Sequence, residues 1–89
     1  MLQKVSDYAQ QLYKMHVPNS EIEETSRIFE VLPETASQLS DPTVPLENRL
    51  AIIDSIFPTE VRDILKVLCQ NGLLSSWMDI ADEYRRVSE

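Results

Sequence analysis

Apolar residues recur every three or four positions along most of the chain, in segments separated by proline or glycine. This spacing places them on one face of an α-helix, whereas a half-buried strand alternates apolar and polar residues. The separating residues are Pro18, Pro33, Pro42, Pro45, Pro58 and Gly72. No stretch shows sustained alternation bounded by hairpin turns. The sequence therefore predicts an all-α fold, a compact bundle of six short helices that forms one domain over residues 1–89.

Each expected helix carries an apolar stripe that predicts a buried face. The helices are expected over residues 2–16, 20–32, 33–40, 45–57, 58–71 and 74–86. The stripes consist of Leu2, Val5, Ala9, Leu12, Tyr13, His16, Ile22, Thr25, Phe29, Leu32, Ala36, Leu39, Leu46, Leu50, Ile53, Phe57, Val61, Ile64, Leu65, Leu68, Leu74, Trp77, Ile80, Ala81 and Tyr84, with Ile52 and Ile56 widening the fourth. Stripes of this kind are typical of helices that pack around one shared core.

Residue types at the segment boundaries predict how several helices begin and end. Ser20 followed by Glu23 is a capping-box pattern, in which the hydroxyl accepts the Glu23 amide and the carboxylate reaches back. Pro33 suits a first helical position because no amide is needed there. Gly72 is expected to end the fifth helix in the left-handed conformation. Arg85 and Arg86 lie in the last turn, where cations complement the helix dipole.

Composition and charge exclude several classes of function. The 89 residues carry 15 acidic and 8 basic side chains, a net charge of −7, so we expect no nucleic-acid partner. One glycine excludes Gly-rich phosphate loops. One cysteine excludes an internal disulfide and a cysteine-rich zinc site, and it agrees with a reducing compartment. No apolar run approaches ~18 residues and no signal segment is visible, so no direct membrane insertion is expected.

The chain is short of catalytic groups, and we expect no enzyme, no cofactor and no metal site. Cys69 lies in an apolar helical run, which indicates a buried and inert thiol. His16 is the only histidine and stands at a helix end, which favours a boundary role. Glu21, Glu23 and Glu24 fall in a first helical turn, where the dipole favours acids. A small hydrolase that uses Cys69 and His16 is the enzymatic alternative.

Some apolar residues lie outside the predicted core faces. At ~100° per residue, Val67 lies more than ~90° from the centre of the fifth core stripe. It shares that side with Glu60, Asp63 and Asn71. In the first helix, Met1, Tyr8 and Met15 form a flanking series. A wide core stripe or scattered surface residues would also explain these positions. Together they favour an exposed groove that suits an amphipathic partner helix with some basic residues.

Five short motifs follow one another in a specific order. They are Tyr8-Ala9-x-x-Leu12-Tyr13, Leu39-Ser40-Asp41-Pro42, Arg49-Leu50-x-Ile52-Ile53-x-x-Ile56-Phe57, Ile64-Leu65-Lys66-Val67-Leu68-Cys69-Gln70-Asn71-Gly72-Leu73-Leu74 and Ile80-Ala81-Asp82-Glu83-Tyr84. The fourth, an apolar helix followed by Asn-Gly, is the most specific. In this order and at these distances, the motifs make the chain resemble the delta subunit of bacterial F-type ATP synthase, equivalent to the mitochondrial oligomycin sensitivity-conferring protein. The similarity covers essentially the whole chain.

The chain departs from the pattern of that family at three points. Leu73 stands where the family usually has arginine, and Tyr13 replaces the commoner phenylalanine. The chain also stops where the first domain of the family stops. The resemblance therefore implies an N-terminal domain over residues 1–89, without the C-terminal half that joins the b subunit of the peripheral stalk.

The resemblance implies a six-helix bundle that binds the N-terminal helix of an alpha subunit in a groove between the first and fifth helices. The expected partner-binding residues are Tyr8, Gln11, Leu12, Met15, Asp63, Ile64, Val67 and Asn71. Tyr8 and Val67 are expected as central contacts, since buried aromatic and aliphatic anchors usually dominate such interfaces. Asp63 is expected as a rim charge. Leu12 and Ile64 also point toward the predicted core.

The role that the resemblance implies is mechanical. The domain would sit on the catalytic head, which the peripheral stalk holds static against rotor torque so that proton flow drives ATP synthesis. It would catalyse nothing itself and would lie peripherally at the cytoplasmic face of the bacterial cell membrane. The alternative from another class is an unrelated all-α interaction domain, or a homodimerising regulatory domain that uses the same groove.

Overall fold

The computed structural model describes residues 3–88, with side chains from residue 5 to residue 87, and it confirms the all-α fold. The elements are α1 (Gln3–Lys14), α2 (Asn19–Val31), α3 (Pro33–Ser40), α4 (Leu46–Ile56), α5 (Thr59–Gln70), the short 3₁₀ helix η1 (Leu74–Ser76) and α6 (Trp77–Ser88). No strand occurs among residues 3–88. Leu2, an expected core residue, and Met1, of the flanking series, lie outside the described residues.

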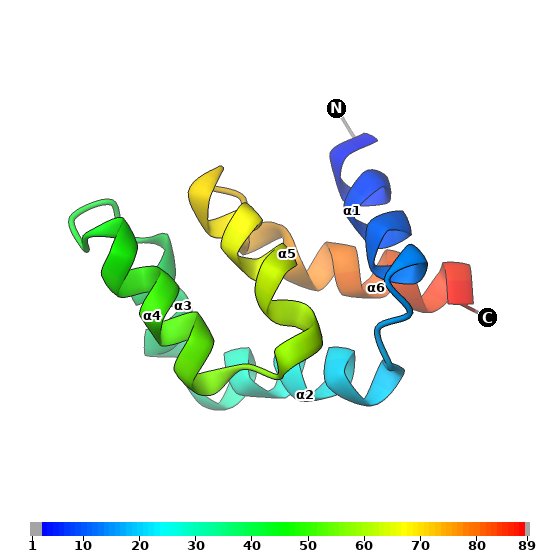
Figure 1. The fold of residues 1–89 in the computed structure, drawn as a ribbon, viewed down its shortest axis with the longest axis horizontal. Coiled ribbons are helices and arrows are strands. Elements are labelled where there is room, and N and C mark those ends of the chain that lie inside the picture. The colour runs from blue at the N-terminus through cyan, green and yellow to red at the C-terminus, as the bar shows by residue number, and fades with distance from the viewer. Residues whose placement is uncertain (1–2, 89) are drawn as a thin grey trace.

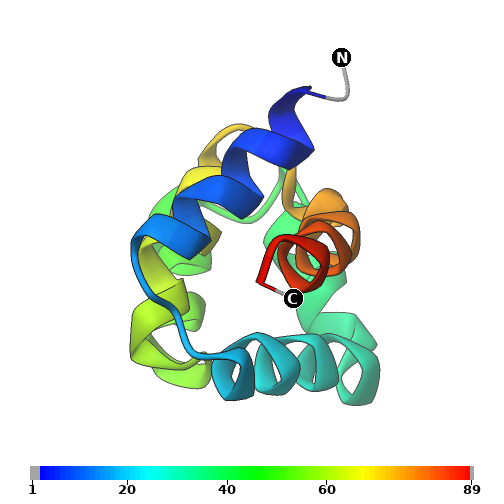
Figure 2. The same cartoon turned by 90° about the vertical axis from the view of Figure 1, so that its right-hand side faces the viewer.

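The helices surround one core, and the first helix packs against the last. Figure 1 shows α5 between α4 and α1, with α2 along the lower edge of the view. α1 lies mainly against α6, α4 lies against α5, and α2 contacts α3, α5 and α6. Figure 2 shows α6 nearly end on, with α1 on one side of it and α2 on the other.

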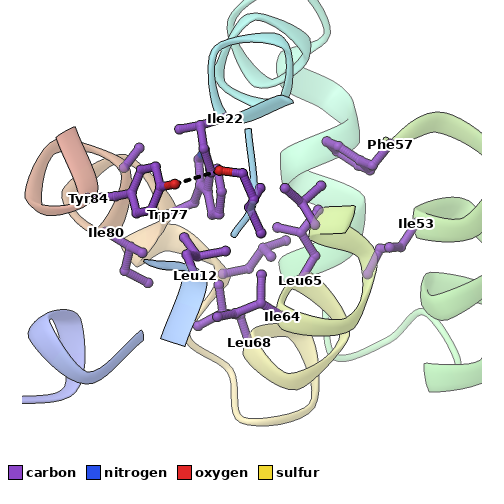
Figure 3. Packing of buried hydrophobic residues seen from close by; sticks show 14 of the residues in the cluster. Leu12, Ile22, Ile53, Phe57, Ile64, Leu65, Leu68, Trp77, Ile80 and Tyr84 are labelled. Atoms are coloured by element: carbon purple, nitrogen blue, oxygen red, sulfur yellow. Dashed lines mark hydrogen bonds between the residues drawn. The ribbon is translucent and has the colours of Figure 1, made fainter. Parts of the chain in front are cut away.

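Large apolar side chains from every part of the chain fill the centre. Leu12, Leu65 and Trp77 are at most 1% exposed, and Figure 3 shows them converging from α1, α5 and α6. The Phe29 ring lies 5.1 Å from the Phe57 ring and 6.5 Å from the Trp77 ring, centroid to centroid, within the range of favourable aromatic pairs. The core prediction is therefore confirmed for most stripe positions.

Several stripe positions at or beyond helix ends are wrong. Tyr13, near the end of α1, is 52% exposed, and His16, beyond that end, is exposed too. Three others stand at the ends of α2 and α4. Leu32 and Leu46 are 40% exposed and Ile56 is 39% exposed. Leu32 links α2 to α3, and the other two are the first and last residues of α4, so their side chains extend past the core. Ser26 is buried instead, and its Oγ accepts a hydrogen bond of 3.2 Å from Trp77 Nε1. A buried hydroxyl is tolerated there because it is hydrogen-bonded.

The predicted capping box at Ser20 is also wrong. α2 begins at Asn19, one residue earlier than expected, so Ser20 lies inside the first turn. The N-cap is Pro18, with φ −64° and ψ 144°, and no side chain caps the helix. Pro45 and Pro58 begin α4 and α5 in the same way. Proline thus sets three helix starts, because its fixed φ suits the first turn and the missing amide is not needed there.

The residue before each of these prolines has its backbone carbonyl hydrogen-bonded by a side chain. Arg49 Nε donates to the Val44 carbonyl at 3.0 Å, and Arg62 Nε donates at 2.9 Å to the carbonyl five residues before it. Tyr84 Oη donates to the Val17 carbonyl, the bond drawn in Figure 3. The residue before a proline is usually extended, and its carbonyl needs a partner from outside the helix. These three side chains supply that partner.

Two helices end at residues with a positive φ, and an ion pair links the last helix to the second. Gly72 has φ 70° after α5, which confirms the predicted left-handed stop. His16 has φ 58° after α1, so its boundary position is confirmed too. Arg85 forms ion pairs with Glu23 at 2.8 Å and with Asp82 at 2.7 Å, and the first of these ties α6 to α2.

Candidate functional site

α1 and α5 approach each other on one side of the bundle, where both leave part of their surface uncovered. α1 contacts α5 less than it contacts α6, and the two helices stand side by side in Figure 1. One hydrogen bond, from Asn71 Nδ2 to Tyr8 Oη, joins them at 3.3 Å. This bond identifies which flank of each helix faces the other.

The facing flanks carry apolar side chains that the domain itself does not cover. Val67 lies one turn before Asn71 on α5 and is 40% exposed. Met15 lies two turns after Tyr8, just beyond the end of α1, and is 38% exposed. Gln11, one turn after Tyr8 and one turn before Met15, is exposed. We define the α1–α5 face as Tyr8, Gln11, Met15, Asp63, Val67 and Asn71.

Tyr8 joins the face to the core. It is half-buried and packs against the core cluster, while its hydroxyl accepts the bond from Asn71. Leu12 is 0% exposed and Ile64 is 3% exposed, and both point into the core in Figure 3. These two expected contact residues therefore lie beneath the face and fix the two helices that carry it.

Acidic groups lie at the N-terminal end of α5, beside this face. Asp63 is exposed, and the backbone amide of Glu60 donates to Glu21 Oε1 at 3.1 Å. Burial raises the pKa of Glu21 above its ordinary value, and the neighbouring Glu60 and Glu24 carboxylates raise it further. These acidic side chains favour a basic residue on a partner that covers the α1–α5 face near the start of α5.

The two residues of the enzymatic alternative have different surroundings, because His16 is exposed and Cys69 is buried. Cys69 is 2% exposed, and its Sγ lies 3.4 Å from the Leu39 carbonyl and 3.8 Å from Arg49 Nη1. Neither of these contacts involves His16. The burial of Cys69 confirms the prediction of a thiol inside the core. Among residues 3–88, no group of three or more His, Cys, Asp or Glu side chains is placed to hold a metal ion.

The sequence missed how the two flanks are joined. The bond between Tyr8 and Asn71 spans 63 residues, and the contact between Glu21 and the α5 start spans 39 residues. Helical phase alone does not predict contacts between distant helices. The exposure of Val67 and Met15 was predictable, because it depends only on the phase within one helix.

The comparisons with known proteins bear on the whole chain. Residues 4–89 match a family model described as ATP synthase delta (OSCP) subunit. Neither the curated proteins nor the solved structures gave a match. Within the described residues, no helix is both long and apolar enough to cross a membrane. The family match agrees with the resemblance carried by the five motifs.

Proposed function

Because the chain belongs to the ATP synthase delta (OSCP) subunit family, we propose that its α1–α5 face binds the N-terminal helix of an ATP synthase alpha subunit. The family is a structural subunit of the peripheral stalk. The observation that carries the proposal is the pair Met15 and Val67, which stay 38% and 40% exposed beside the Tyr8–Asn71 contact. An amphipathic helix is the partner that such a surface fits.

The chemistry of the face describes its partner. Apolar side chains of the bound helix would cover Val67, which belongs to α5, and Met15, which follows α1. Asp63 and the acids at the start of α5 would face basic residues at the edge of that helix. The net charge of −7 favours encounter with a basic segment over long distances. The apolar contacts set the affinity, and the charges set orientation and encounter rate.

In this role the domain transmits force and performs no chemistry. Bound to an alpha subunit, it would hold the catalytic head static while the rotor turns, so that proton flow is coupled to ATP synthesis. The same proposal assigns the link to the b subunit to a second domain of the parent subunit, as the resemblance implies. It places the assembly peripherally at the cytoplasmic face of a bacterial cell membrane.

A peptide titration tests the proposal. A synthetic N-terminal helix of the alpha subunit is added to ¹⁵N-labelled domain, and amide resonances are followed. We expect saturable shifts at Tyr8, Met15, Val67 and Asn71. A scrambled peptide of identical composition and charge is the control, and it should cause no saturable shift. Shifts confined to α2 or α4, or equal shifts with the scrambled peptide, would reject the proposal.

A further inference from the structure

Two arginines occupy the same position in successive helices but have different surroundings. Arg49 and Arg62 each follow a proline by four residues, are half-buried, and donate from Nε to the carbonyl five residues before them. Arg49 also places Nη1 3.8 Å from Cys69 Sγ and lines a small cavity. For Arg62, the bond from Nε to the carbonyl before the proline accounts for its position. For Arg49, the equivalent bond accounts only for Nε and leaves the role of Nη1 in the cavity unexplained.

The cavity lies where α3 ends, α4 begins and α5 gives way to η1. Its volume is about 100 Å³. The apolar part of its wall comes from Leu39, Cys69 and Leu74. Its polar part comes from Ser40, Arg49 and Ser75. At roughly 30 Å³ per water, this volume holds a group of a few heavy atoms and nothing larger.

The positive charge in this cavity has no carboxylate bound to it. No acidic group among the described residues forms an ion pair with Arg49. Asp41, whose carboxylate feels the charge of Arg49, hydrogen-bonds Thr43 instead: its Oδ1 accepts bonds from Thr43 N at 2.9 Å and from Thr43 Oγ1 at 2.7 Å. These bonds lower the pKa of Asp41, and the charge of Arg49 lowers it further. The Arg49 guanidinium therefore attracts a nearby anion without forming an ion pair with it.

We propose that this cavity binds a phosphate-sized oxyanion, held by the Arg49 guanidinium and the hydroxyls of Ser40 and Ser75. A planar guanidinium presents paired donors that match the oxygens of a tetrahedral oxyanion, and hydroxyl groups supply further donors. The apolar side of the cavity is buried, since Leu39, Cys69 and Leu74 are at most 5% exposed. The site is separate from the α1–α5 face, because Cys69 and Val67 are two residues apart and therefore about 160° apart around α5.

Titration with inorganic phosphate tests this site directly. Phosphate is added to ¹⁵N-labelled domain at constant pH and constant ionic strength, with sodium chloride as the balancing salt. We expect saturable shifts of the Ser40, Ser75 and Arg49 Nε resonances, and the same shifts with sulfate. If phosphate shifts nothing, or if acetate and chloride shift these resonances equally, the proposal is wrong.

Matched variants separate the cavity from the helix start. Ser75→Ala keeps both arginines and should weaken phosphate binding several-fold while the domain stays folded. Arg49→Gln should weaken it at least about tenfold, since a charged hydrogen-bonding group is lost. Arg62→Gln removes the equivalent helix-start contact and should leave phosphate binding unchanged. Equal losses from Arg49→Gln and Arg62→Gln, with no effect of Ser75→Ala, would overturn the proposal.

Discussion

Placing one negative charge at either of two adjacent positions of α5 tests whether the α1–α5 face is exposed for binding. Val67 is 40% exposed, whereas its neighbour Leu68 is 0% exposed and points into the core in Figure 3. Val67→Asp should strongly weaken binding of the alpha-subunit helix with little loss of stability. Leu68→Asp should unfold the domain. The two variants have the same charge, so their different outcomes depend on position alone.

The exposed fraction of Val67 gives the size of the binding effect. Complete burial of an aliphatic side chain is worth about 1.5–3 kcal/mol, so covering the exposed 40% is worth about 1 kcal/mol. Desolvating a carboxylate without a partner costs about 1–3 kcal/mol more. The sum of about 2–4 kcal/mol raises Kd about 30- to 700-fold. In the free domain the carboxylate keeps its water, so the free energy of unfolding should change by about 1 kcal/mol or less.

At Leu68 the same substitution acts on the core. Removing a buried leucine costs about 2–5 kcal/mol, and an unpaired buried charge adds about 3–5 kcal/mol. A domain of 89 residues has a total stability of about 4–13 kcal/mol at the usual value per residue. The combined cost of about 5–10 kcal/mol is as large as most of that range. We therefore expect Leu68→Asp to lack a cooperative thermal transition.

Circular dichroism melting and peptide calorimetry measure the two quantities. Met78→Asp is the control for Val67→Asp, because Met78 is 41% exposed and lies on α6. It should bind the peptide with the affinity of the unsubstituted domain. Two results would refute the reasoning: unfolding of Val67→Asp to the same degree as Leu68→Asp, or wild-type affinity in a folded Val67→Asp.

Two further predictions concern the frame that supports this face. Tyr84→Phe leaves the Val17 carbonyl without its partner and should lower the free energy of unfolding by about 1–3 kcal/mol, measured by urea titration. Burial raises the pKa of Tyr84, so the stability that its hydroxyl contributes should be complete below pH ~10 and should fall as the pH rises above that value. If Tyr84→Phe loses stability between pH ~10 and higher pH to the same extent as the unsubstituted domain, this prediction is wrong. Gly72→Ala should lower stability by about 1 kcal/mol through backbone strain alone, since φ is 70° and a Cβ there meets nothing within 4 Å, whereas Gly72→Asn should lose less. Equal melting temperatures for the unsubstituted domain, Gly72→Ala and Gly72→Asn would show that the strain is absent.

The sequence predicted those features that depend on neighbours along the chain. The stripe of α5 placed Val61, Leu65 and Leu68 in the core and Val67 outside it, and each is found there. A fixed angle between successive residues is enough for such predictions. The stop at Gly72 was predictable for the same reason, because the conformational freedom of glycine is local.

Contacts between helices set the features that the sequence did not predict. The sequence indicated Ser20 as the cap of α2, whereas the helix begins one residue earlier and Pro18 is its N-cap. Leu32 and Ile56 have the phase of core residues, yet the core ends before it reaches them. The bond between Tyr8 and Asn71 depends on where α1 crosses the bundle, which no local pattern specifies.

The hydrogen bond from Tyr84 to the Val17 carbonyl joins the two ends of the domain, and this affects the order in which the domain folds on the ribosome. The Val17 carbonyl receives its partner from 67 residues later in the sequence, and α1 packs mainly against α6. During synthesis, α1 therefore emerges first and lacks its main packing partner until the final helix has left the exit tunnel, although α5, its lesser partner, emerges earlier. The α1 half of the α1–α5 face is completed last. On the proposal that the α1–α5 face binds an alpha subunit, this order of assembly delays that binding until α6 has been translated.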